Sequence, residues 1–457
     1  MRAYLRKDLL EGIYGYKFVL SLVLSLTVIP FTLFLGAERY KLEASEYRQS
    51  TERAWEAVTT QPPKPPHSAA HVGISIWKPP TPTVAFSTGA LNELGVSTNI
   101  DPHQTPRLSG SLSERTPLLN LFGKLDYAVV IQVIFGLFAF VLSFDLISGE
   151  REDGTLKLVL ANSVSRSRVL LGKTLGGALV LLIPVTLATL LSLLFFTPAM
   201  GVSLTGTHWL QVLGVFLLSC LFLVMMFVLG LLVSCLTRRR MTSMIVLLVV
   251  WVCLIFVVPR AATSVAQHLV TLPSSEEVSR RIREASSEAF ERNMQVINEW
   301  LAENPGLTQR DVPPSVQVAA RRAMDQYNES QEARIRQSVD VALRRQVWLA
   351  TSLARISPAT SYMLAVTHLS GTGVHRHQRF LRHLDEYRRR FAEYFNRMED
   401  DDIQLVEDFA GVPRFEYAEE PLANLVPTVM VDASIMATLC VLLFGAAFAA
   451  FIRYDVR

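Results

Sequence analysis

The residues best suited to a chemical role lie between positions 148 and 173. Acidic residues at 150, 152 and 153 are followed directly by Gly154, which permits a tight turn. Thr155 then begins a short predicted helix. This helix offers the apolar side chains Leu156, Leu158, Val159 and Leu160. Charge, turn and short helix in this order predict docking onto a protein groove, with Glu150 and Glu152 beside it.

Groups for catalysis or metal binding are weaker candidates. His375 and His377, with His383 nearby, have no companion carboxylate or cysteine set, so a surface role is favoured over a metal site. The sequence has no HExxH motif and no paired intramembrane acids, and Asp145 is interpreted as interfacial. All four cysteines fall in or beside apolar runs, which argues against a disulfide framework. We therefore predict no enzyme.

The elements that carry these residues are membrane spans. Half of the residues are hydrophobic and 19% are charged. Apolar runs occur near residues 18–36, 126–147, 168–197, 208–236, 242–259 and 427–452. Each is long enough to cross about 30 Å of hydrocarbon. The sequence thus predicts an all-α membrane protein with about six spans.

The first run competes with a signal peptide, because Arg2, Arg6 and Lys7 precede it. The run is long for such a segment, contains Pro30 and leads into charged residues without a small-residue cleavage site. We interpret it as an uncleaved anchor.

Basic residues near the spans predict the orientation, because Lys and Arg favour the cytoplasmic side. With both termini inside, the loops 148–167 and 237–241 and the C-terminal tail are cytoplasmic. The basic residues of these parts are Arg151, Lys157, Arg166, Arg168, Arg238, Arg239, Arg240, Arg453 and Arg457. Topology and long helices account for the basic groups, so the net charge of +3 gives no reason to expect nucleic acid as a partner.

Two segments are then predicted to be external. In 37–122, residues 38–57 read as a polar helix, and the proline-rich stretch 60–108 reads as extended or lightly β-structured. In 260–425, Ser274 and Glu277 form a capping box for one helix, and a second follows Pro313 and Pro314. A third helix has the apolar stripe Phe380, Leu384, Tyr387, Phe391, Phe395 and Met398. Together they predict an external helical domain, with Arg388 to Arg390 on its solvated face or against anionic headgroups.

The stretch from Glu150 to Lys173 resembles the E-x-E-x-G-T-L, S-R and L-x-G-K coupling region of type-2 ABC exporter permeases, between their second and third spans. Residues 1–16 are similar to the amphipathic elbow helix of that family. The long insert before the last span, with Ser357 to Ser361 and Leu369 to Gly373, resembles a subgroup with a large external helical domain of unknown function.

The resemblance implies five parts. These are an elbow helix and first span (1–36), an external segment (37–122), spans two to five with a coupling helix at 150–166 (123–259), an external helical domain (260–425), and the last span with a cytoplasmic tail (426–457). It also implies ATPase-coupling residues, namely Glu150, Glu152, Gly154, Thr155, Leu156, Leu158, Ser165 and Arg166. Gly172, Gly176 and Gly177 allow close helix packing in the bilayer.

The chain has no G-x-x-x-x-G-K-[ST] phosphate loop, so nucleotide hydrolysis is expected from a separate subunit. The resemblance implies two partners: two copies of an ABC ATPase, which bind ATP and Mg, and a second permease, as homodimer or heterodimer. It implies no cofactor in this chain itself. The expected location is a bacterial inner membrane. One hypothesis is export or extraction of an amphiphilic substrate. The alternative is mechanotransmission, in which external helices drive a periplasmic or outer-membrane partner and nothing crosses the spans.

Overall fold

The computed structural model describes residues 14–89, 95–102, 106, 108–110, 125–161, 165–199, 201, 204–401 and 403–453. Most of the predicted elbow helix and the last four residues of the tail lie outside these ranges. The described chain divides into two compact units. One comprises Met1–Val258 with Arg355–Arg457, and the other is Pro259–Ala354.

Six helices are long and apolar enough to cross a membrane: Tyr16–Thr59, Tyr127–Glu152, Arg166–Phe195, Gly206–Leu236, Arg240–Leu269 and Leu422–Ile452. The predicted fold class, an all-α membrane protein with six spans, is therefore confirmed. The first of these helices, α2 (Tyr16–Thr59), continues without a break through the polar stretch 38–57.

Two of the spans are composite. The second consists of α6 (Tyr127–Val130), the π-helical turn η2 (Ile131–Phe135) and α7 (Gly136–Ser143), after which α8 (Ser148–Glu152) follows. The fifth consists of α12 (Arg240–Val252), the π-helical turn η3 (Cys253–Val257) and α13 (Val258–Leu269). A π-turn places one extra residue in the helix, so the side chains on its two sides face different directions.

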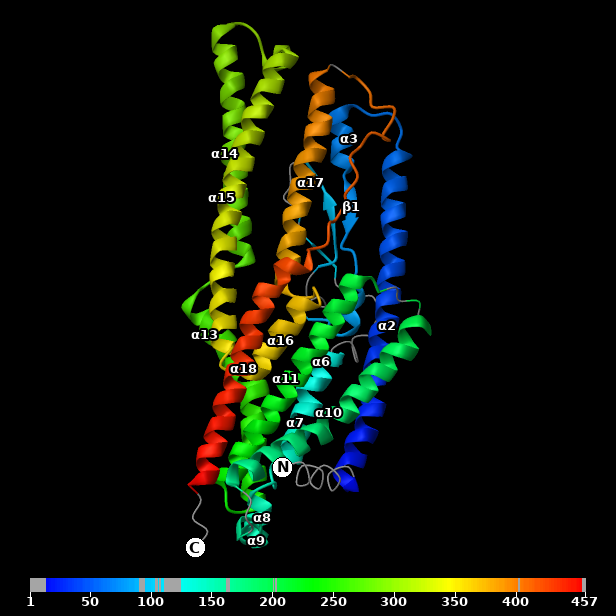
Figure 1. Cartoon of the computed structure of the whole chain (residues 1–457). Helices are drawn as coiled ribbons and strands as arrows, with labels where there is room; N and C mark the ends of the chain where they lie inside the picture. Colours follow the sequence, from blue (N-terminus) through cyan, green and yellow to red (C-terminus); the bar gives the residue numbers. More distant parts are fainter. Residues whose placement is uncertain are drawn as a thin grey trace. The chain divides into compact units, whose positions relative to one another are not determined.

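The core of the first unit forms around α11 (Gly206–Leu236), which packs against α7, α10 (Arg166–Ala199), α16 (Pro358–Leu369) and α18 (Leu422–Ile452) (Figure 1). Here the ring of Phe222 on α11 stacks on Tyr362 of α16 with centroids 4.7 Å apart. Ser219 and Tyr362 share a hydrogen bond of 2.9 Å. The short helix α16 thus belongs to the span core, although it falls within the predicted external domain.

A second core in the same unit includes α17 (Val374–Asp400) and α3 (Pro66–Val72). Strands β1 (Ile74–Trp77) and β2 (Ser97–Ile100) pair antiparallel, with Ile74 opposite Ile100. The predicted apolar stripe of α17 is confirmed: Phe380, Leu384, Tyr387, Phe391 and Phe395 are buried there together with Val58, Ile76 and Phe409. The proline-rich stretch forms this small sheet, the 3-10 turn η1 (Pro82–Ala85) and α3.

The second unit is a helical hairpin of α14 (Ser275–Glu303) and α15 (Pro314–Ala354), with the short 3-10 turn η4 (Gln309–Asp311) between them (Figure 1). Half of the predicted capping box is confirmed, because the hydroxyl of Ser274 accepts a hydrogen bond of 3.1 Å from the Glu277 amide. The Glu277 carboxylate instead accepts bonds from Arg280 and Arg281. Small residues such as Ala285, Ala289 and Ala320 are buried between the helices.

Residues 260–425 therefore do not form one domain. α14 and α15 lie in the second unit, whereas α16 and α17 lie in the first. The physical reason is side-chain size: α17 presents large aromatic residues that need a broad partner surface, and α14 and α15 have alanines that suit a narrow two-helix contact. Arg388, predicted on a solvated face, is 8% exposed and donates a 2.7 Å hydrogen bond to the carbonyl of Pro102.

Candidate functional site

The predicted docking residues lie on two short helices, α8 and α9 (Thr155–Ala161). Gly154 separates them with a φ of +75°, and no other atom lies within 4 Å of the position a Cβ would take. The turn at Gly154 and the helix that begins at Thr155 are both confirmed. Only glycine adopts this backbone conformation without strain, so the residue sets the angle between α8 and α9.

Arg240, at the beginning of α12, anchors two of the acidic residues, Glu152 and Asp153. Its backbone amide donates a 2.9 Å hydrogen bond to the Glu152 carboxylate, which places a negative charge at a helix N-terminus. Its guanidinium pairs with Asp153 and donates to the carbonyl of Gly149 at 3.4 Å. A Cβ at Gly149 would lie 2.8 Å from Nε of Arg240, so glycine permits this approach.

Three more polar contacts fix α8 to the spans. Nζ of Lys173 on α10 lies 2.6 Å from the Glu150 carboxylate, and this lysine side chain is 10% exposed. Arg151 donates a 2.8 Å hydrogen bond to the carbonyl of Thr237. Just before α8, the Asp145 carboxylate accepts bonds of 2.8 and 2.9 Å from Lys17 on α2. The acids are thus anchored to three different spans, α2, α10 and α12, and Arg151 adds a contact to the residue after α11.

The apolar residues of α9 divide into an inner and an outer set. Leu156 is 1% exposed and packs with Ile147, Leu170 and Phe451 in a core of the chain itself. It is not available to a partner groove, contrary to the prediction. The side chain of Leu158 is 70% exposed, and Val159 and Leu160 are half-buried. The outer surface of α9 is therefore formed by Leu158 with the exposed Thr155 and Lys157.

The remaining predicted residues lie on α10 or directly before it. Ser165 accepts hydrogen bonds from the amides of Arg168 and Val169, and Arg166 donates 2.6 Å to the carbonyl of Ile452 at the end of α18. Gly172 and Gly176 are buried within the helix packing. A Cβ on Gly177 would lie 2.3 Å from the ring of the fully buried Phe227 of α11. Close packing is thus observed directly at Gly177.

Sequence reasoning did not single out Lys17, Lys173 and Arg240 as partners of the acids. Lys17 and Lys173 sit at the ends of apolar runs, where a basic residue is expected for topology alone. The only sign of these pairs in the sequence is that basic and acidic residues both occur at the ends of predicted spans. Together these contacts bring the start of α2, the α8–α9 pair, residues 237–240 and the end of α18 to one end of the spans.

The histidines of α17 do not gather into a metal site. Among the described residues, no group of three or more His, Cys, Asp or Glu side chains is placed to hold a metal ion. His375 faces Glu420 at 3.5 Å and His383 faces Glu386 at 3.9 Å. Burial lowers the pKa of His377 to about 4, and nearby Lys78 acts in the same direction.

Six apolar helices, with the ion-paired helix α8 and the short helix α9 at one end, define a multi-pass membrane protein. The sequence profile of the ABC-2 family transporter proteins matches residues 3–456, nearly the whole chain. The chain belongs to the ABC-2 transporter family. It is therefore a transporter membrane subunit, of a kind that is normally not catalytic itself and works with an ATPase partner. No curated protein matches the chain in sequence. The more specific subgroup stays a prediction.

Proposed function

We propose that the chain is the permease subunit of an ABC exporter, and that the α8–α9 end receives the movement of a separate ATPase. The observation that carries this is a set of charged or polar contacts around α8. α8 itself contacts α10, α12 and the carbonyl of Thr237 after α11, and Asp145 just before it contacts α2. A displacement of α8 would act on several spans together, because each contact is short and directional.

The basic residues support the orientation. Lys17, Arg151, Lys173 and Arg240 all lie at the α8–α9 end, as does Arg166, which donates a hydrogen bond to the carbonyl of Ile452. Under the positive-inside rule this end is cytoplasmic, where an ATPase has access to ATP and Mg. α17, the small sheet and the α14–α15 hairpin would then be external. Two permeases and two ATPases would complete the transporter, in a bacterial inner membrane.

The substrate is proposed to be an amphiphile that is exported or extracted from the membrane. The spans of α12 and α18 bury only 17% of their most apolar windows within the chain. Such surfaces suit lipid, a second permease or an amphiphilic substrate.

One feature favours the alternative, mechanotransmission. α15 has 41 residues, so at 1.5 Å per residue it extends about 60 Å. It and α14 carry charged pairs along their length, including Arg280 with Glu277 and Arg344 with Asp340 at 2.7 Å. A long, polar hairpin could move a partner outside the membrane without a path for substrate through the spans.

ATP hydrolysis by the complex with the cognate ATPase in proteoliposomes tests the coupling proposal. We expect Leu158→Ser and Glu152→Gln to reduce ATPase binding or its stimulation by the permease at least fivefold. Leu307→Ser is the matched control, since Leu307 is 46% exposed in the turn between α14 and α15. Unchanged binding and hydrolysis in both α8–α9 variants would contradict the assignment.

The same preparation separates the two functions. Export predicts that amphiphiles stimulate hydrolysis and that labelled substrate leaves its original leaflet. Mechanotransmission predicts that shortening the α14–α15 hairpin abolishes the biological output while ATP hydrolysis continues.

A further inference from the structure

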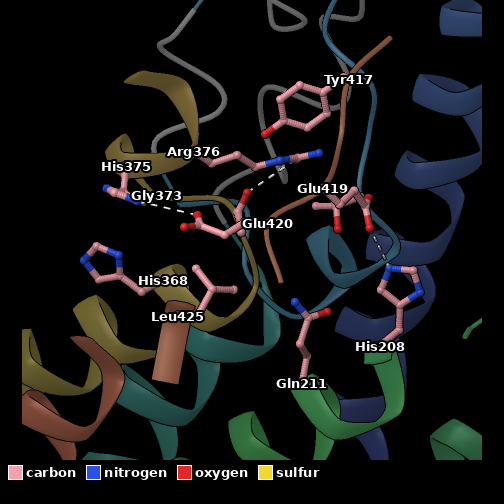
Figure 2. A pocket seen from close by; sticks show the side chains of 12 residues that line it. His208, Gln211, His368, Gly373, His375, Arg376, Tyr417, Glu419, Glu420 and Leu425 are labelled. Atoms are coloured by element: carbon pink, nitrogen blue, oxygen red, sulfur yellow. Dashed lines mark hydrogen bonds and ion pairs between the residues drawn. The ribbon is translucent and has the colours of Figure 1, made fainter. Parts of the chain in front are cut away.

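A pocket lies at the opposite end of the spans from α8 and α9. It is formed by the start of α11, the end of α16, the beginning of α17 and the segment that leads into α18 (Figure 2). The hollow measures about 490 Å³, including space open to solvent. The predicted coupling residues contribute nothing to it.

Gln211 provides the first sign of a ligand. It lies one turn after His208 at the start of α11 and is 8% exposed. Its side-chain oxygen is buried and has no hydrogen-bond partner in the described part of the chain. Figure 2 shows its amide pointing into the pocket, toward the segment with Glu419. A buried acceptor without a donor destabilises the folded chain, so binding of a ligand that donates a hydrogen bond here would be favoured.

Two neighbouring carboxylates in the pocket differ in how they are paired. Glu420 lies 3.1 Å from Arg379 and 3.5 Å from His375. The side chain of Glu419 is 58% exposed and faces Nε2 of His208 at 3.7 Å, a pair that is ionic only when the imidazole is protonated. The other ring nitrogen of His208 contacts the Thr205 hydroxyl at 3.0 Å. Glu419 is therefore the carboxylate more open to a ligand cation.

Two further nitrogen-bearing side chains line the pocket, Arg376 and His368. Arg376 donates to the carbonyls of Gly371 at 3.3 Å and Pro79 at 3.0 Å, and its guanidinium lies 5.7 Å from the centroid of the Tyr417 ring. Burial lowers the pKa of His368, which keeps this ring neutral near pH 7. The groups that remain for a ligand are thus acceptors, Glu419 and Gln211.

A residue type that is common at membrane–water interfaces lies beside the pocket. Trp209, next to His208, is 45% exposed, and tryptophan is enriched at membrane–water interfaces. Leu425, in the first turn of the last span, adds an apolar wall. We propose that the pocket binds the primary ammonium headgroup of an amphiphile, which donates N–H bonds to the Glu419 carboxylate and the Gln211 amide oxygen. This site goes beyond the proposed ATPase coupling and does not depend on it.

Binding of phosphatidylethanolamine to the purified full-length chain, measured without ATPase or ATP, tests the proposal. Phosphatidylcholine is the comparison lipid, because its trimethylated ammonium has no N–H to donate. We expect phosphatidylethanolamine to bind at least tenfold more tightly. Competition by free ethanolamine at similar concentrations would identify a soluble amine as the ligand source, and the absence of such competition would identify the lipid. Equal affinities for both lipids, with no ethanolamine binding, would overturn the proposal.

Two variants locate the site. We expect Glu419→Gln and Gln211→Leu each to weaken binding about tenfold, while Glu416→Gln, an exposed acid on the same segment, leaves it unchanged. Melting temperatures report whether each variant folds. Should Gln211→Leu fail to fold, the comparison of Glu419→Gln with Glu416→Gln decides, and equal affinity in these two would overturn the site.

Discussion

The ion pair between Arg355 and Asp432 supports the most demanding prediction. Asp432 lies on α18 and is fully buried, with an exposure of 0%. Arg355 directly follows α15 and reaches both carboxylate oxygens, with Nε at 2.6 Å and Nη2 at 3.1 Å. We therefore consider three variants, Asp432→Asn, Arg355→Met and the two combined.

The expected magnitude follows from burial. Two unit charges about 4 Å apart attract by about 4 kcal/mol at an effective dielectric constant of 20. Removing one partner leaves the other charge buried, which typically costs about 3–5 kcal/mol. The Arg355 side chain is 24% exposed, so in Asp432→Asn water can still solvate part of the unpaired guanidinium. In Arg355→Met the unpaired group is the fully buried Asp432 carboxylate. Arg355→Met should therefore lower the free energy of unfolding more than Asp432→Asn. The double variant should lose about 2–3 kcal/mol less of the free energy of unfolding than the two single variants added together.

The free energy of unfolding of the chain in mixed micelles, titrated with SDS, measures these differences. Arg389→Met is the matched control, because Arg389 pairs with Asp385 at 3.1 Å while 65% of its side chain is exposed. Such surface pairs contribute about 0–1 kcal/mol. Single variants that lie within about 0.5 kcal/mol of this control would refute the argument that the pair is desolvated and coupled.

Two further predictions concern stability. Burial, with Arg376 nearby, lowers the pKa of Lys78 to about 7. Between pH 7 and about 10 the unfolded chain therefore binds a proton that the folded chain does not. The stability of the wild-type chain consequently rises with pH over this range. Lys78→Met should raise the melting temperature most at pH 6.5 and less at pH 9; an equal gain at both values would contradict this. Gly177→Ala should destabilise the chain by about 1–3 kcal/mol, because the added methyl group would overlap with Phe227. Gly445→Ala is the control, since no atom lies within 4 Å of its Cβ position. Equal melting temperatures of the two variants would argue against tight packing at Gly177.

The spans could be predicted from sequence because each is a continuous apolar run with its own length requirement. The stripe of α17 was equally clear, since Phe380, Leu384, Tyr387 and Phe391 recur at intervals of three and four. The residues that pack against this stripe could not be predicted, because periodicity indicates that a face is buried but not what covers it. The residues that cover it, such as Val58 and Ile100, lie far away along the chain.

The coupling region shows the same limit. Gly154 and Thr155 predicted the turn and the helix start from local backbone chemistry alone. Leu156 and Leu158 have the same residue type, yet the first is buried in the chain and the second is exposed. Only the positions of Leu170 and Phe451, which come from distant segments, separate them. Polar pairs such as Arg355 with Asp432, 77 positions apart, are likewise set by the tertiary fold.

The unbroken course of α2 has a mechanical consequence. At one end Lys17 bonds to Asp145 beside α8, and at the other Val58 is buried with the aromatic residues of α17. At 1.5 Å per residue its 44 residues form a rod of about 66 Å. A tilt of about 1° pivoting at Lys17 would displace the far end by about 1 Å, a distance comparable to the shifts that repack helix interfaces. α2 thus connects the α8 end of the spans to the α17 core, and a small tilt at the first end becomes a larger displacement at the second.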